Sequence, residues 1–111
     1  MNFTTKETNG VSVITLEGSI LGGPDAAELN STLHKLIDAK KKKVVIDLSE
    51  VSLMNSSGLG ILIGGLTALR NAGGTLKLAS PSPKILNLLT ITKIISLFEV
   101  HDSVKKAIES F

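Results

Sequence analysis

The stretch V-V-I-D-L-S-E-V-S-L-M-N-S-S-G-L-G, residues 44–60, decides the fold of this chain. Its first part, Val44 to Leu48, is a short apolar run rich in β-branched side chains, which is typical of an interior strand covered on both faces. Residues 55–57, Asn-Ser-Ser, favour a helix N-cap, and leucine and isoleucine then recur at helical spacing. The pattern predicts a buried strand followed by a helix over 56–71, with serines at the point where that helix opens.

The remaining segments predict one further hairpin and additional helices and strands. Asn9-Gly10 favours a primed hairpin turn between two strands, and Pro24 suits the first turn of a helix that ends near Lys40. The later predicted elements are a strand over 75–79, a helix capped by Ser82, a last strand over 94–100 and a terminal helix capped by Asp102. This order predicts one α/β domain over residues 1–111. Its sheet is mixed, largely parallel after the N-terminal hairpin, with helices packed against it.

The composition argues against several classes of function. Twelve basic and ten acidic residues give a net charge of only +2, and three phenylalanines with no tyrosine or tryptophan provide no stacking platform, so nucleic-acid binding is not expected. No cysteine is present, which suits a reducing cytoplasm. The N-terminus lacks the apolar region of an export signal, and the longest apolar run is too short to span a bilayer. We therefore expect a cytoplasmic chain without a membrane span.

The residues that could support catalysis do not form a recognisable pattern. His34 and His101 are the only histidines, and their spacing from Ser56 does not indicate a hydrolase triad. The carboxylates are scattered, without the clustered ligands that a metal site requires. Glycines 58, 60 and 64 resemble a dinucleotide loop, but the third glycine is displaced and the strand is predicted to end too far upstream. The sequence predicts no enzyme, no cofactor and no metal.

Residues 47–60 resemble the signature of the STAS domain, the fold of bacterial anti-sigma-factor antagonists, which typically reads D-L-S-x-V-x-x-x-D-S-[ST]-G-L-G. The matching positions are Asp47, Leu48, Ser49, Val51, Ser56, Ser57, Gly58, Leu59 and Gly60. Asn55 stands where the family usually has aspartate. The resemblance covers nearly the whole chain and implies a STAS-like fold.

The resemblance also implies a function. In this family the serine after the acidic position is phosphorylated by a partner serine kinase, which is also the anti-sigma factor, so Ser56 is the expected acceptor and Ser57 the second choice. The unphosphorylated chain is expected to bind that kinase and release a sigma factor for transcription, and a serine phosphatase is expected to reset the switch. The partner-binding residues expected from the resemblance are Asp25, Asn55, Ser56, Ser57, Gly58, Leu59 and Gly60.

Each of these assignments has an alternative. Ser56 could be an ordinary N-cap, and Gly58 and Gly60 could serve close packing of the helix on the sheet as well as close approach of a partner. Leu21 occupies roughly the place of an upstream acidic residue of the family, and Asp25 lies a few residues later as a substitute. The missing upstream acidic residue and Asn55 in place of aspartate favour a second hypothesis. In it, the chain is a constitutive STAS scaffold subunit of a larger complex such as a lipid-transport machine.

Overall fold

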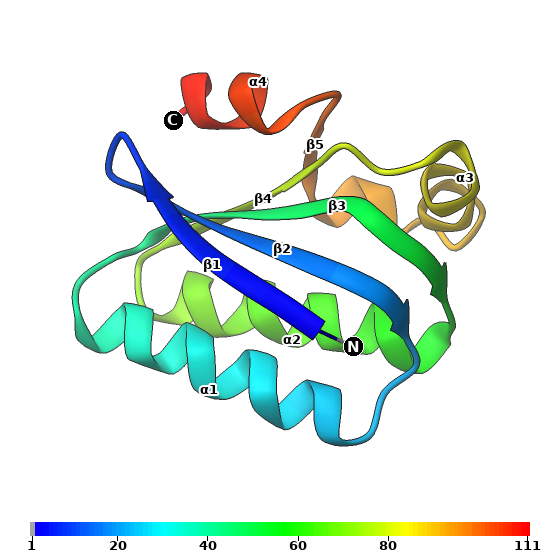
Figure 1. Ribbon diagram of the computed structural model, residues 1–111, viewed down its shortest axis with the longest axis horizontal. Coiled ribbons are helices and arrows are strands. Elements are labelled where there is room, and N and C mark those ends of the chain that lie inside the picture. The colour runs from blue at the N-terminus through cyan, green and yellow to red at the C-terminus, as the bar shows by residue number, and fades with distance from the viewer. Residues whose placement is uncertain (1) are drawn as a thin grey trace.

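The computed structural model describes residues 2–111, apart from the side chains of residues 25 and 26, and shows a five-stranded sheet with helices on both faces (Figure 1). In chain order the elements are β1 (Asn2–Thr8), β2 (Val11–Ile20), α1 (Pro24–Asp38), β3 (Lys43–Met54), α2 (Ser56–Asn71), β4 (Thr75–Ala79), α3 (Pro83–Ile91), the 3-10 helix η1 (Ile94–Leu97), β5 (Glu99–His101) and α4 (Val104–Glu109). The strands lie in the order β1-β2-β3-β4-β5. Only β1 and β2 are antiparallel, which confirms the predicted mixed sheet.

The opening hairpin and the central strand follow the sequence prediction. Asn9 and Gly10 have positive φ angles of 53° and 78°, as a type I′ turn requires. β1 thereby pairs with β2 at the edge of the sheet. β3 lies in the middle of the sheet, where Val44, Val45, Ile46 and Leu48 are fully buried. The prediction of an interior strand is confirmed.

β3 is longer than predicted, because it continues past Leu48 to Met54. The pairing of β2 with β3 shifts register twice, and each shift leaves one more residue in β3 than in β2. At the first shift, the Asp47 Oδ1 atom accepts a hydrogen bond of 3.0 Å from the Ser49 N–H. The Thr15 hydroxyl donates to Asp47 Oδ2 at 3.4 Å. Pairing resumes after these bulges, so the strand reaches the start of α2.

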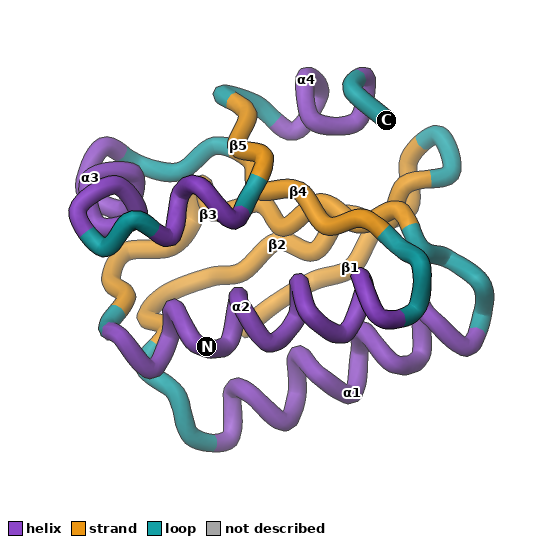
Figure 2. Tube along the Cα trace, turned by 180° about the vertical axis from the view of Figure 1, so that it is seen from behind, coloured by secondary structure: helices purple, strands orange, loops and turns teal. Residues whose placement is uncertain are grey.

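The two faces of the sheet are covered differently. α1 and α2 lie side by side over one face, and α4 lies over the opposite face (Figures 1 and 2). The large core lies on the α1 and α2 side and includes Ile14, Leu16, Leu29, Leu33, Ile46, Leu62 and Leu69. The smaller core beneath α4 is formed by Val11, Val13, Val45, Ala79 and Ala107. Val104, Ile108 and Phe111 pack against that smaller core.

The segment after α3 differs from the predicted strand over 94–100. Lys93 adopts a left-handed conformation with φ 62°, residues 94–97 form η1, and only Glu99–His101 pair with β4. A short apolar run does not by itself distinguish a strand from a helical turn, and here Ile94 and Ile95 reach the core from η1. The predicted cap of the last helix is also wrong. The Ser103 hydroxyl, rather than Asp102, accepts the capping hydrogen bond.

Candidate functional site

The start of α2 is organised by Asn55, which is the N-cap residue of this helix. Asn55 has extended backbone angles, and its Oδ1 atom accepts a hydrogen bond of 2.8 Å from the Gly58 N–H. Its backbone carbonyl accepts the first helical hydrogen bond, from the Leu59 N–H at 2.9 Å. Ser56 and Ser57 therefore occupy the first two helical positions. The prediction of a cap among residues 55–57 is confirmed, and the asparagine, rather than a serine, provides it.

Because Asn55 provides the cap, the two serine hydroxyls are not needed for it. Ser56 and Ser57 are both exposed. Within the part of the chain that the structure describes, neither hydroxyl makes a side-chain hydrogen bond. The first turn of a helix also carries partial positive charge from its unpaired N–H groups. The site thus presents exposed hydroxyls where an anionic group would be stabilised.

The loop between β2 and α1, residues 21–23, lies against the start of α2. The Asn55 Nδ2 atom donates to the Leu21 carbonyl at 3.3 Å, and the Asn55 N–H donates to the Ile20 carbonyl at 3.4 Å. Gly22 has φ 100°, and a Cβ atom placed on it would lie 2.8 Å from the Ser57 Cβ. The loop can approach the serines this closely because residue 22 has no side chain.

The two predicted glycines of the motif have different surroundings. A Cβ atom on Gly58 would lie 2.1 Å from the Ile20 carbonyl oxygen, so this glycine allows α2 to pack against the end of β2. A Cβ atom on Gly60 would meet no atom within 4 Å. Leu59, between them, is 2% exposed and lies in the core, where it supports the site from beneath. Close packing therefore explains Gly58, whereas Gly60 leaves an open surface.

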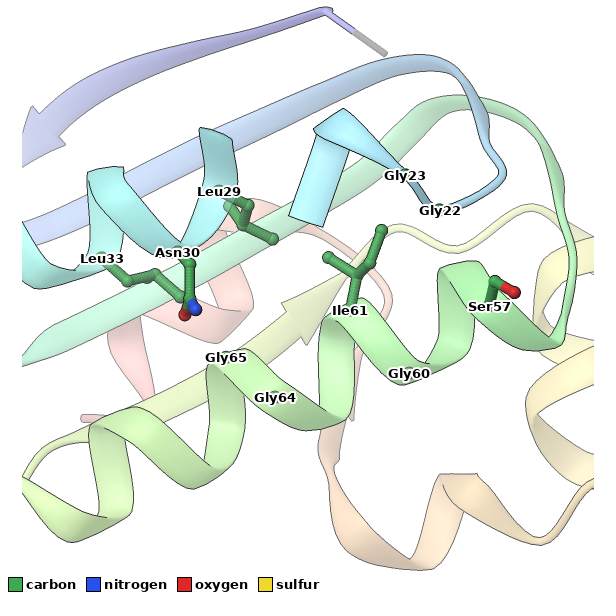
Figure 3. Close-up of a pocket in the computed structure, with 10 residues that line it drawn as sticks. All are labelled: Gly22, Gly23, Leu29, Asn30, Leu33, Ser57, Gly60, Ile61, Gly64 and Gly65. Atoms are coloured by element: carbon green, nitrogen blue, oxygen red, sulfur yellow. The ribbon is translucent and has the colours of Figure 1, made fainter. Parts of the chain in front are cut away.

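A groove between α1 and α2 adjoins the serines (Figure 3). Its volume is about 250 Å³. It is lined by Gly22, Gly23, Leu29, Asn30, Leu33, Ser57, Gly60, Ile61, Gly64 and Gly65. This groove was not predicted from the sequence, although the recurrence of glycine at 60 and 64 is a signal for a hollowed helix face. Ser57 borders the groove and Ser56 is not part of its lining.

The exposed apolar side chains at the same end of the sheet were also not predicted from the sequence. Leu21 is 47% exposed in the loop after β2, and Leu53 is 42% exposed near the end of β3. Ile91, at the end of α3, is 67% exposed and lines a small groove with Met54, the last residue of β3. Large apolar residues at the ends of strands and helices were the available signal. Their exposure depends on how those elements pack.

The structure also bears on the other predicted features. The side chain of Asp25 lies outside the described residues, and its role stays a prediction. Among the described residues, no group of three or more histidine, aspartate or glutamate side chains could hold a metal ion. β3 ends only one residue before α2, which corrects the prediction that the strand ends too far upstream for a tight turn. The displaced third glycine still departs from a dinucleotide loop.

Comparison with known proteins identifies the family. The model of the STAS domain family matches residues 2–107. The chain belongs to the STAS domain family. Within the described part of this STAS domain, no helix is long and apolar enough to cross a membrane.

The chain is similar to several anti-sigma factor antagonists. A protein of Bordetella bronchiseptica that is named as a candidate anti-sigma factor antagonist, BtrV, is 26% identical over 111 residues, which is 100% of this chain and 95% of the relative. The anti-sigma-B factor antagonist of Listeria monocytogenes is 38% identical over 57 residues, or 51% of this chain and 50% of the relative. The structure of the Bacillus cell-fate determinant SpoIIAA in its phosphorylated form superposes with a TM-score of 0.74 at 20% identity, covering 98% of both chains.

Proposed function

We propose that this STAS domain is a phosphorylation-switched binding module, with Ser56 as the phosphoacceptor. In its unphosphorylated form it binds an anti-sigma serine kinase in the cytoplasm and thereby releases a sigma factor for transcription. A serine phosphatase restores this form. The proposal rests above all on the exposed Ser56 hydroxyl at the first position of α2, which Asn55 relieves of a capping role.

The surroundings of the two serines favour Ser56 over Ser57 as the acceptor. The Ser57 Cβ atom lies against Gly22, and Ser57 borders the groove between α1 and α2. Ser56 is exposed and lies outside that groove lining. A kinase must bring the γ-phosphate of ATP in line with the hydroxyl oxygen. We therefore assign the reaction to the less enclosed side chain.

The chemistry of the step requires only a hydroxyl from this chain. The Ser56 Oγ atom attacks the γ-phosphorus of ATP, the bond from that phosphorus to the bridging oxygen breaks, and ADP leaves. The kinase supplies the Mg²⁺ ion and the base that takes the hydroxyl proton. This accords with a binding module that is not itself an enzyme.

The fold tolerates a phosphate at this position for electrostatic reasons. A phosphoserine carries about −1.5 to −2 charges at neutral pH. At the first position of α2 these charges face the positive end of the helix and its unpaired N–H groups. Phosphorylation therefore leaves the domain folded.

The expected effect of phosphorylation is on the partner. The exposed apolar side chains of Leu21, Leu53 and Ile91 lie at the same end of the fold as Ser56 and offer an apolar contact area. A dianion brought against an apolar or acidic partner surface loses its hydration without a compensating contact. This loss of complementarity weakens the complex, and the resulting change in affinity is the switch.

Mapping the modified residue tests the proposal. The chain is incubated with its cognate anti-sigma serine kinase and ATP, and the product is digested and analysed by mass spectrometry. We expect one phosphate, on Ser56, and none on a Ser56→Ala variant. Phosphate on Ser57 in the wild-type chain would overturn the assignment.

A binding measurement separates the switch from a constitutive scaffold. Ser56→Asp places a carboxylate at the helix N-terminus, where it is compatible with the fold. Calorimetry with the kinase is expected to give a weaker affinity for Ser56→Asp than for the wild type or Ser56→Ala. Equal affinities for all three chains, together with no phosphorylation, would favour a scaffold subunit of a larger complex instead.

A further inference from the structure

Asn55 makes contacts that the family's usual aspartate cannot make. Its side chain accepts from the Gly58 N–H through Oδ1 at 2.8 Å and donates to the Leu21 carbonyl through Nδ2 at 3.3 Å. An aspartate carboxylate accepts hydrogen bonds but has no N–H to donate. An aspartate in this position would therefore keep the cap, lose the link to the loop and place negative charge beside a carbonyl oxygen.

The loop that Asn55 contacts needs an external restraint. Gly22 and Gly23 are consecutive glycines with φ angles of 100° and 69°, and glycine has the largest conformational freedom of any residue. The same loop carries the exposed side chain of Leu21 and approaches Ser57. If the loop moved freely, Leu21 would not hold a fixed position relative to the serines.

We infer that Asn55 is a positioning and specificity-determining residue, whose amide fixes the loop of residues 21–23 to the start of α2. This inference rests on the proposed function. The kinase then meets Leu21 and the acceptor serine as one preorganised surface, and binding does not have to order the loop. The surface that this chain presents to its partner is uncharged at residue 55, so the partner needs no basic group opposite that residue.

Two variants separate this role from charge and from capping. Asn55→Asp keeps the capping acceptor, loses the donor and adds charge. Asn55→Ser also keeps a neutral capping acceptor, but its hydroxyl is shorter than the amide and does not reach the Leu21 carbonyl. Ser103→Ala, at the start of α4 on the opposite face of the sheet (Figure 1), also removes a side-chain cap and serves as the matched control for helix fraying.

The first measurement uses the free protein. Backbone ¹⁵N relaxation at Gly22 and Gly23 reports the mobility of the loop, and hydrogen exchange of the Gly58 amide reports the cap. We expect both Asn55 variants to increase the mobility of the two loop glycines while the Gly58 amide stays protected. An unchanged loop in both variants would overturn the positioning role.

The second measurement is affinity for the purified anti-sigma serine kinase, with KM and kcat for phosphorylation. Both Asn55 variants are expected to weaken binding and raise KM by about two- to tenfold, the range that one net hydrogen bond provides, with kcat nearly unchanged. Weakening by Asn55→Asp alone would assign the effect to charge and overturn the inference. Wild-type affinity in both variants would overturn it as well.

The two arms also separate this inference from the proposed function. If the wild-type chain bound no kinase, the proposed function would fall. Increased loop mobility in both variants, with a protected Gly58 amide, would still support Asn55 as the residue that positions the loop.

Discussion

Serine hydroxyls at the start of α2 and at the end of α4 differ in how the fold uses them. The Ser110 Oγ atom accepts a hydrogen bond of 2.6 Å from Lys77 Nζ, lies 3.2 Å from His101 Nε2 and donates to the Ala107 carbonyl at 2.7 Å. Ser56 and Ser57 are exposed, and the described structure gives their hydroxyls no such partners.

The difference indicates which polar groups are structural and which are left for partners. Lys77 is only 6% exposed, pairs with Glu99 and lies 4.3 Å from the centre of the Phe111 ring. These contacts attach the short helix α4 to the sheet. At the start of α2, Asn55 caps the helix, and within the described structure the Ser56 and Ser57 hydroxyls have no side-chain hydrogen-bond partner. Hydrogen bonds within the chain occupy the Ser110 hydroxyl at the end of α4, whereas the serine hydroxyls at the start of α2 remain exposed to partners.

The largest expected effect comes from removing the hydroxyl of one serine in each of the two regions. Ser56→Ala is expected to abolish phosphorylation by the kinase, whereas Ser110→Ala leaves it at the wild-type rate. Because Ser56 is not the N-cap, its removal is expected to change the free energy of unfolding by no more than about 0.5 kcal/mol. Radiolabelled phosphate transfer and urea unfolding measure the two quantities. Full phosphorylation of Ser56→Ala would contradict the assignment.

A pair of glycine variants tests the packing beneath the serines. Gly58→Ala places a methyl group against the Ile20 carbonyl and is expected to cost about 1–3 kcal/mol or more. Gly60→Ala adds a methyl group in open space and is expected to stabilise α2 by about 0.5–1 kcal/mol. Urea unfolding compares both with the wild type. A Gly58→Ala variant as stable as Gly60→Ala would show that α2 does not need this close approach.

The attachment of α4 is tested through its buried lysine. Lys77→Met removes the donor to the Ser110 carbonyl and hydroxyl, and we expect a loss of about 1–3 kcal/mol in the free energy of unfolding. Lys106→Met is the control, because its pair with Asp102 is exposed at 3.7 Å and contributes at most about 1 kcal/mol. Both variants should be phosphorylated normally. Slower phosphorylation of Lys77→Met would show that the attachment of α4 affects the serines at the start of α2, and would contradict the separation of the two regions.

The smallest effect concerns pH. Hydrogen bonds from Lys77 and His101 hold the pKa of Glu99 below its ordinary value of 4.5. Because the folded-state pKa is the lower one, the stability that ionised Glu99 contributes is complete above that ordinary value and is lost as the pH falls through the folded-state pKa. Unfolding measured from pH 6 downwards should therefore show the wild type losing its advantage over Glu99→Gln. Glu28→Gln, an exposed residue of α1, is the control. A constant difference between wild type and Glu99→Gln at all pH values would contradict this linkage.

Local signals in the sequence were sufficient for much of the fold. The Asn9-Gly10 turn, the proline that opens α1, the serine that caps α3 and the apolar run of β3 all act over a few residues, and each lies where it was predicted. The full length of β3 was not predictable in this way, because its second half is polar in part and is held by pairing with β2 across two bulges. The fate of residues 94–100 likewise depended on packing against the core.

The sequence by itself determined the family motif, the order of the elements and the position of the serines at the opening of a helix. It left open which of residues 55–57 caps that helix, and only the tertiary structure decided which residues from other elements surround it. The contact of Asn55 with the Leu21 carbonyl and the groove between α1 and α2 beside Ser57 both join segments that lie far apart in the sequence. Periodicity and local propensity carry no information about such contacts, because they are fixed by the register of β2 with β3 and by the close approach of α2 to Ile20.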